Sequence, residues 1–147
     1  MNTNIESLKI ILDSIKNKID FQLNADNGID SKSGILIGLV GVVAVFYLNI
    51  ENSYIAYIPL VGLVITSYFL FKLTNPKTYN TGSLDPYDDS NGYRSMSEDK
   101  LLNQMISDYQ KAFDDNSKIL NLKNRNYRKA IILFMFSILL MIIINFI

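Results

Sequence analysis

Three long apolar blocks without a charged residue constrain this sequence more than any other feature. They cover 34–50, 54–71 and 130–147, which are 17, 18 and 18 residues long. A bilayer core about 30 Å thick needs roughly 20 helical residues, and about 17 to 25 are tolerated. The alternative is that all three blocks are core helices of a small soluble domain, which would leave them little amphipathic covering. The blocks therefore predict a transmembrane hairpin over 33–73, with spans at about 34–50 and 54–73, and a third span at 130–147.

The basic residues predict the orientation of these spans. Four of the 14 Lys and Arg residues lie in 1–33 and the other ten lie in 72–129. The link 49–53 has no basic residue, and its single charged residue is Glu51. Basic residues close to span ends favour the cytoplasmic side. We therefore expect an inner-membrane protein with its N-terminus and residues 74–129 in the cytoplasm and its C-terminus outside. The first thirty residues contain no apolar core of a signal peptide.

The segments outside the blocks predict two further helical parts. Residues 1–32 form an amphipathic helix and a junction, and the turn-like residues 24–28 should end or kink this helix before the first span. Residues 74–96 hold several Pro and Gly residues and predict a loop. No Pro or Gly follows Gly92, so a stalk helix over 97–129 should continue into the third span. The predicted fold is therefore an all-α, multi-pass membrane protein with a long helix that leads from the stalk into the membrane.

Both cytoplasmic helices carry an apolar stripe that neither can bury alone. They should pack on each other and on copies from neighbouring subunits, which predicts a homo-oligomer. Asn116 and Lys123 interrupt the stripe of the stalk helix. One interpretation places both at the solvated edge of the stripe or lets their polar ends reach water by snorkelling. The other buries them, where they would fix the register between subunits at a cost in stability.

Small residues mark the faces where the spans can approach closely. Gly34, Gly38 and Gly41 share one face of the first span. This face can pack on the second span, where Gly62 offers another flat surface, or on a second subunit. Pro59, early in the second span, indicates either local accommodation in the helix or a kink used in gating. Interfacial anchoring is expected for Tyr54, Tyr127, Arg128 and Lys129.

Composition excludes several kinds of chemistry. The chain has no Cys and no His, which excludes thiolate nucleophiles, histidine bases and the usual zinc sites. The acidic loop 84–92 lacks the alternating ligand positions of an EF-hand. The net charge of zero gives no general attraction for nucleic acid. We therefore expect no enzyme activity, no cofactor and no metal site, and the bilayer as the main partner.

Two short motifs resemble a known family. The sequence Asp30-Ser31-Lys32-Ser33 at the start of the first span resembles the Asp-x-Lys-Ala/Ser junction of compact transmembrane effectors of anti-phage systems, namely the Pycsar transmembrane effectors and the related SLATT-type effectors. The stretch from Asn116 to Lys123, followed by the basic residues before the last span, is similar to their helix that re-enters the membrane. The resemblance implies a membrane-impairing protein that is inactive until infection, with Asp30, Lys32, Asn116 and Lys123 at the matching positions.

The resemblance also sets out the functional alternatives. Pycsar effectors respond to a cyclic nucleotide, but this chain has no segment large enough for a separate nucleotide-binding domain. A trigger would therefore be a cytoplasmic partner protein or a signalling ligand at the cytoplasmic helices. The first hypothesis is an oligomeric effector that permeabilises the inner membrane. The alternative is a non-catalytic anchor or scaffold whose stalk docks a soluble partner.

Overall fold

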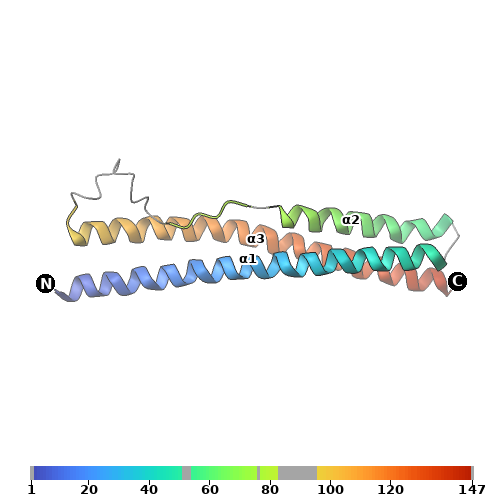
Figure 1. Cartoon of the computed structure of the whole chain (residues 1–147), viewed down its shortest axis with the longest axis horizontal. Helices are drawn as coiled ribbons and strands as arrows, with labels where there is room; N and C mark the ends of the chain where they lie inside the picture. Colours follow the sequence, from blue (N-terminus) through green and yellow to red (C-terminus); the bar gives the residue numbers. More distant parts are fainter. Residues whose placement is uncertain (1, 51–53, 76, 83–95, 147) are drawn as a thin grey trace. The chain divides into compact units, whose positions relative to one another are not determined.

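The computed structural model describes residues 2–50, 54–75, 77–82 and 96–146, and within these ranges every regular element is a helix. The elements are α1 (Asn2–Ile50), the short 3-10 helix η1 (Tyr54–Ala56), α2 (Tyr57–Thr74) and α3 (Glu98–Asn145) (Figure 1). The predicted all-α fold is confirmed, including the long helix that leads into the third span. The acidic loop predicted at 84–92 lies outside the described residues.

Three helices are suited to a membrane. Each of α1, α2 and α3 contains an apolar stretch that is long enough to cross a bilayer. Many apolar side chains in these stretches are exposed, among them Ile35 at 74% and Val64 at 69%. Such exposure is unfavourable in water but not against lipid tails, which are as apolar as these side chains. The predicted transmembrane character of the three blocks is therefore confirmed.

The expected end of the first helix at residues 24–28 is wrong, because α1 runs from Asn2 to Ile50 as one helix. A kink at these residues remains a prediction. Gly28 is helical and costs only about 1 kcal/mol relative to alanine in a helix interior. On both sides of it, α1 makes polar contacts with α3, through Gln22 and Asp26 before it and through Asp30 after it. These contacts stabilise helical backbone through a stretch whose local sequence favours a turn.

The chain divides into two compact units. The stalk unit consists of Met1–Ala25 and Thr78–Leu120, and the membrane unit consists of Asp26–Lys77 and Asn121–Ile147. All three apolar blocks lie in the membrane unit. Both α1 and α3 contribute residues to each unit, because each is a single helix that runs through the division.

In the stalk unit, α1 packs on the N-terminal part of α3. The buried apolar side chains of this unit are Leu12 and Ile19 on α1 and Leu102 and Ala112 on α3. In the same unit an exposed ion pair also joins the two helices. The Nζ of Lys9 on α1 lies 2.7 Å from a carboxylate oxygen of Glu98 on α3, and both side chains are about half exposed. The apolar stripe predicted for the N-terminal segment is thus used to pack on the chain's own stalk helix.

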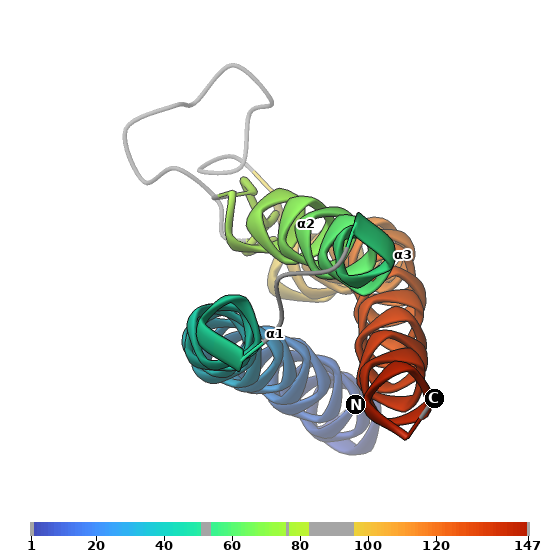
Figure 2. The same cartoon turned by 90° about the vertical axis from the view of Figure 1, so that its right-hand side faces the viewer.

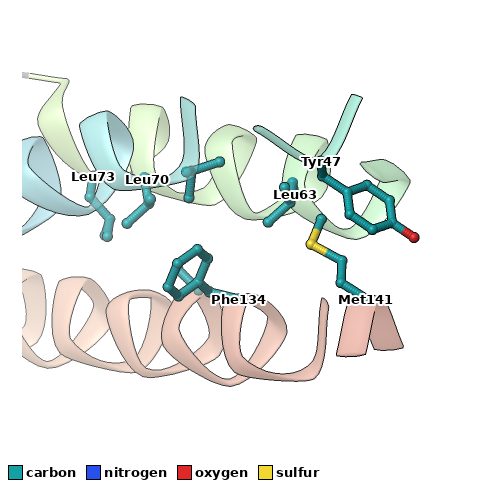
Figure 3. Close-up of a cluster of buried hydrophobic side chains, with 8 residues drawn as sticks. Tyr47, Leu63, Leu70, Leu73, Phe134 and Met141 are labelled. Atoms are coloured by element: carbon teal, nitrogen blue, oxygen red, sulfur yellow. The ribbon is translucent and has the colours of Figure 1, made fainter. Parts of the chain in front are cut away.

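In the membrane unit, all three helices contribute to one apolar core. Its buried members come from α1, α2 and α3, and six of them are labelled in Figure 3: Tyr47, Leu63, Leu70, Leu73, Phe134 and Met141. In Figure 2, α2 lies beside α3. Pro59 lies in the first turn of α2, where its missing N–H has no helical partner to lose. Local accommodation therefore explains this proline, and the structure gives no support to a gating kink.

Candidate functional site

A buried lysine joins α1 to α3 in the membrane unit. Lys123 lies on α3 two turns before the third apolar block, and its side chain is only 1% exposed. Its Nζ donates hydrogen bonds to the carboxylate of Asp26 at 2.8 Å and to that of Asp30 at 3.0 Å. Both aspartates are on α1, four residues apart, and so lie on one face of that helix. We name these three residues the aspartate–lysine cluster.

Electrostatics keep the lysine of this cluster charged. Burial acts to lower the pKa of Lys123, but the hydrogen bonds and charges of Asp26 and Asp30 outweigh it and raise the pKa above its ordinary value of 10.5. The ammonium therefore remains protonated at neutral pH. The Asp26 side chain is 9% exposed and that of Asp30 is 37% exposed. The cluster thus has one carboxylate shielded from water and one that is partly hydrated.

The structure brings together two of the four residues that the family resemblance indicated for coupling. Asp30 and Lys123 are in contact, whereas Lys32 is exposed and is not part of the cluster. Sequence reasoning missed Asp26 because this residue was assigned to a turn. The spacing Asp26-x-x-x-Asp30 could have indicated it, since residues four apart share a helix face.

Asn116 and Lys123 are both buried, so the interpretation that they sit at a solvated edge is wrong. Asn116 is fully buried and Lys123 is 1% exposed. The polar partners of both residues belong to the same chain. A role for these two residues in the register between subunits remains a prediction.

Asn116 holds an extended segment along α3 in the stalk unit. Its Nδ2 donates to the backbone carbonyl of Asn80 at 2.7 Å, and its Oδ1 accepts from the backbone N–H of Asn80 at 3.0 Å. Two residues later Gly82 has a positive φ of 66° and lies against Tyr109, so that a Cβ at this position would come within 2.8 Å of the tyrosine ring. Asn116 and Gly82 therefore fix segment 78–82 on the surface of the stalk helix.

A second polar contact in the stalk unit was not predicted. Gln22 is 5% exposed, and its Nε2 donates to the hydroxyl of Ser117 at 2.6 Å and to the carbonyl of Phe113 at 3.2 Å. One turn further along α1 comes Asp26 of the cluster. The sequence offers little indication of this contact, because a single glutamine beside an apolar stripe is common on solvated helix faces.

The four glycines have different surroundings. A Cβ added to Gly34, Gly38 or Gly41 would meet nothing within 4 Å. Gly41 borders an apolar groove of about 440 Å³ between α1 and α2, so the two helices do not pack closely at this face. The expected packing of this face on the second span is therefore wrong, and its contact with a second subunit remains a prediction. Gly62, in contrast, lies directly against the side chain of Ser137 on α3.

The four expected anchor residues lie at helix ends or just before the last span. Tyr54 is 91% exposed, and Arg128 and Lys129 are exposed as well. Tyr127 is partly buried and packs on the core of the membrane unit. Their position relative to the headgroups remains a prediction.

These observations define a multi-pass helical membrane protein in which polar contacts hold two long helices together. The chain belongs to the Pycsar effector family, because the family described as Pycsar effector protein domain matches residues 22–147. The match includes all three spans and the aspartate–lysine cluster. Comparisons with curated proteins and with solved structures find no match. The resemblance to the Pycsar effectors drawn from the two short motifs is confirmed, and the family match supports a membrane effector of anti-phage signalling.

Proposed function

We propose that the protein is an oligomeric inner-membrane effector of anti-phage defence that permeabilises the membrane when a signal reaches its cytoplasmic helices. The observation that carries this proposal is the family match over residues 22–147, which covers every apolar block. The signal is a cytoplasmic partner protein or a signalling ligand. The distribution of basic residues supports a cytoplasmic N-terminus and a cytoplasmic segment 74–129.

The polar groups within the spans support a requirement for several subunits. Thr66, Ser137 and Asn145 each donate a hydrogen bond to the backbone carbonyl four residues earlier in the same helix. These three donors are therefore bonded within their own helices, and they form no polar path among the described residues of one chain. Permeation would require spans from several copies, or a disturbance of the lipid around them.

The aspartate–lysine cluster supports a route for the signal. It ties α1 to α3 close to the point where both helices continue into apolar blocks. If one helix moves along the other, the ion pairs of the cluster are either retained or broken, which defines two alternative positions of the helices. The buried cluster thus gives the two helices discrete relative positions, as expected for an element that switches between two states.

The proposal is tested by following membrane potential and dye uptake in cells with inducible expression. The protein is expressed either alone or together with the genes that neighbour its own gene, and each culture is tested with and without phage. We expect depolarisation when the protein and the products of the neighbouring genes are present and phage is added. A truncated chain that lacks residues 130–147 controls for the effect of overexpression. If strong expression never depolarises cells under any condition, the effector proposal is refuted and the anchor hypothesis is favoured.

A further inference from the structure

The stalk unit has an open groove that its own helices leave uncovered. The groove has a volume of about 810 Å³ and lies between α1 and α3, where Phe113 and Leu120 of α3 form one wall. The other wall is one continuous face of α1, formed by Ile10, Asp13, Ser14, Asn17, Lys18 and Phe21. The groove is mainly apolar, but it has a charged residue of each sign on its α1 wall.

The groove lies in the stalk unit, whereas all three apolar blocks belong to the membrane unit. Phe21 is nevertheless 75% exposed and Ile10 is 66% exposed. Large apolar side chains exposed together outside a membrane indicate an interaction surface. The groove is therefore a surface suited to an interaction partner.

The α1 wall of the groove has the spacing of a coiled-coil seam. Ile10, Ser14, Asn17 and Phe21 follow one another at intervals of four, three and four residues, which is the spacing of a and d positions. Large apolar side chains stand at the two ends of this row, and the polar Ser14 and Asn17 lie between them. This seam differs from the face that packs within the chain, which carries the buried Leu12 and Ile19. Helix α1 thus has one face for its own α3 and a second face that remains available.

The charges beside this seam match a parallel copy of the same helix. In the heptad that places Ser14 at a and Asn17 at d, Asp13 is at g and Lys18 is at e. In parallel coiled coils a g residue pairs with the e residue five positions later on the partner. Asp13 of one copy therefore meets Lys18 of the other. Neither side chain forms an ion pair among the described residues of its own chain.

We infer that the groove is occupied by α1 of a second copy, parallel and in register, with Asn17 of each copy at the centre of the contact. Copies inserted in one bilayer with the same orientation have parallel α1 helices, as the Asp13–Lys18 spacing requires. A polar Asn at a core position favours one register, because a shift leaves its amide without a partner. This inference deepens the proposed oligomeric effector and rests on it.

Cysteine cross-linking in membranes tests the contact directly, because the chain contains no Cys of its own. Asn17→Cys in the full-length chain should give a homodimer band on mild oxidation. The matched control is Ser107→Cys, on an exposed part of α3 outside the groove, which should remain monomeric under the same conditions. Three results would overturn the inference. Asn17→Cys could give no homodimer, both variants could cross-link equally, or Asn17→Cys could form an adduct only with a different protein.

A charge exchange tests the pairing and its direction. Asp13→Lys places like charges opposite each other at both symmetry-related pairs, and Lys18→Asp does the same with the opposite sign. Each single variant should weaken dimerisation by about tenfold, measured by dilution in detergent. The double variant D13K/K18D restores opposite charges and should return the dissociation constant close to that of the original chain. Failure of the double variant to recover would overturn the parallel register.

These measurements do not depend on membrane damage, so the two proposals can fail separately. A cross-linked Asn17→Cys dimer in cells that never depolarise would support the groove contact and refute the effector function. Depolarisation by a protein whose Asn17→Cys variant does not cross-link would support the effector function and overturn the groove contact.

Discussion

The replacement Lys123→Met tests whether the aspartate–lysine cluster stabilises the contact between α1 and α3. Methionine preserves most of the volume of the buried side chain but removes its ammonium. The variant then leaves Asp26, whose side chain is 9% exposed, as a buried carboxylate without its lysine partner. An ionised carboxylate in such surroundings is strongly unfavourable unless it is paired or protonated. We therefore expect a substantial loss of stability.

The structure gives the size of this loss. The hydrogen bond between Lys123 and buried Asp26 contributes about 2 kcal/mol, as is typical of a bond to a charged group. The bond to Asp30 is worth about 0.5 kcal/mol, because this side chain is 37% exposed and partly screened. Repulsion between two carboxylates four residues apart adds about 0.3 kcal/mol. The free energy of unfolding should thus fall by about 3 kcal/mol, at the lower end of the range of about 3–5 kcal/mol for buried pairs that lose one partner.

Thermal unfolding in detergent, followed by far-ultraviolet circular dichroism, measures this loss. For a chain of this size, 3 kcal/mol corresponds to a decrease in Tm of roughly 6–12 °C. The matched control is Lys118→Met, because Lys118 also lies on α3 and has a carboxylate of Asp115 at 2.9 Å, but its side chain is 77% exposed. We expect no measurable change in Tm for this control.

A second variant separates the buried charge from the loss of packing. In the double variant K123M/D26L the unpaired carboxylate is removed, and exchange of a buried ion pair for apolar groups is often close to neutral. The double variant should therefore recover more than half of the lost Tm. The reasoning is refuted if Lys123→Met and Lys118→Met have the same Tm, or if the double variant is less stable than Lys123→Met alone.

Three further predictions concern other parts of the chain and use the same unfolding assay unless stated. Gly82→Ala should destabilise by about 1–3 kcal/mol, because its positive φ disfavours a side chain and its Cβ would come within 3.0 Å of the Cα of Tyr109, whereas Gly38→Ala, which faces open space, should not destabilise the chain. Asn116→Ala should increase hydrogen exchange in segment 78–82 at least tenfold, since it removes both bonds to that backbone; unchanged exchange would contradict the assignment. The raised pKa of Lys123 means that its contribution is complete below pH 10.5 and is lost as the pH rises through the folded pKa. The difference in Tm between the original chain and Lys123→Met should therefore be constant from about pH 7 to 10 and shrink at higher pH.

The sequence alone determined the membrane spans and the helical class. Transfer of a run of apolar residues into lipid depends on the length and composition of the run, not on which helix lies beside it. The absence of Pro and Gly after Gly92 likewise predicted α3 as one long helix, because helix continuity is largely a local property. The resemblance to the Pycsar effectors rested on short motifs next to these spans, and the family match confirms it.

Only the tertiary structure decided which polar residues meet. Asp26 and Lys123 are 97 positions apart, so their contact depends on the relative register of two long helices, which no local pattern records. Tertiary packing also keeps α1 continuous through a turn-like sequence and buries Asn116 against the backbone of Asn80. It also places Gly62 against α3 and leaves Gly34 and Gly38 uncovered. A short polar or small side chain is compatible with water, lipid or a partner helix, and only packing over the whole chain selects among these surroundings.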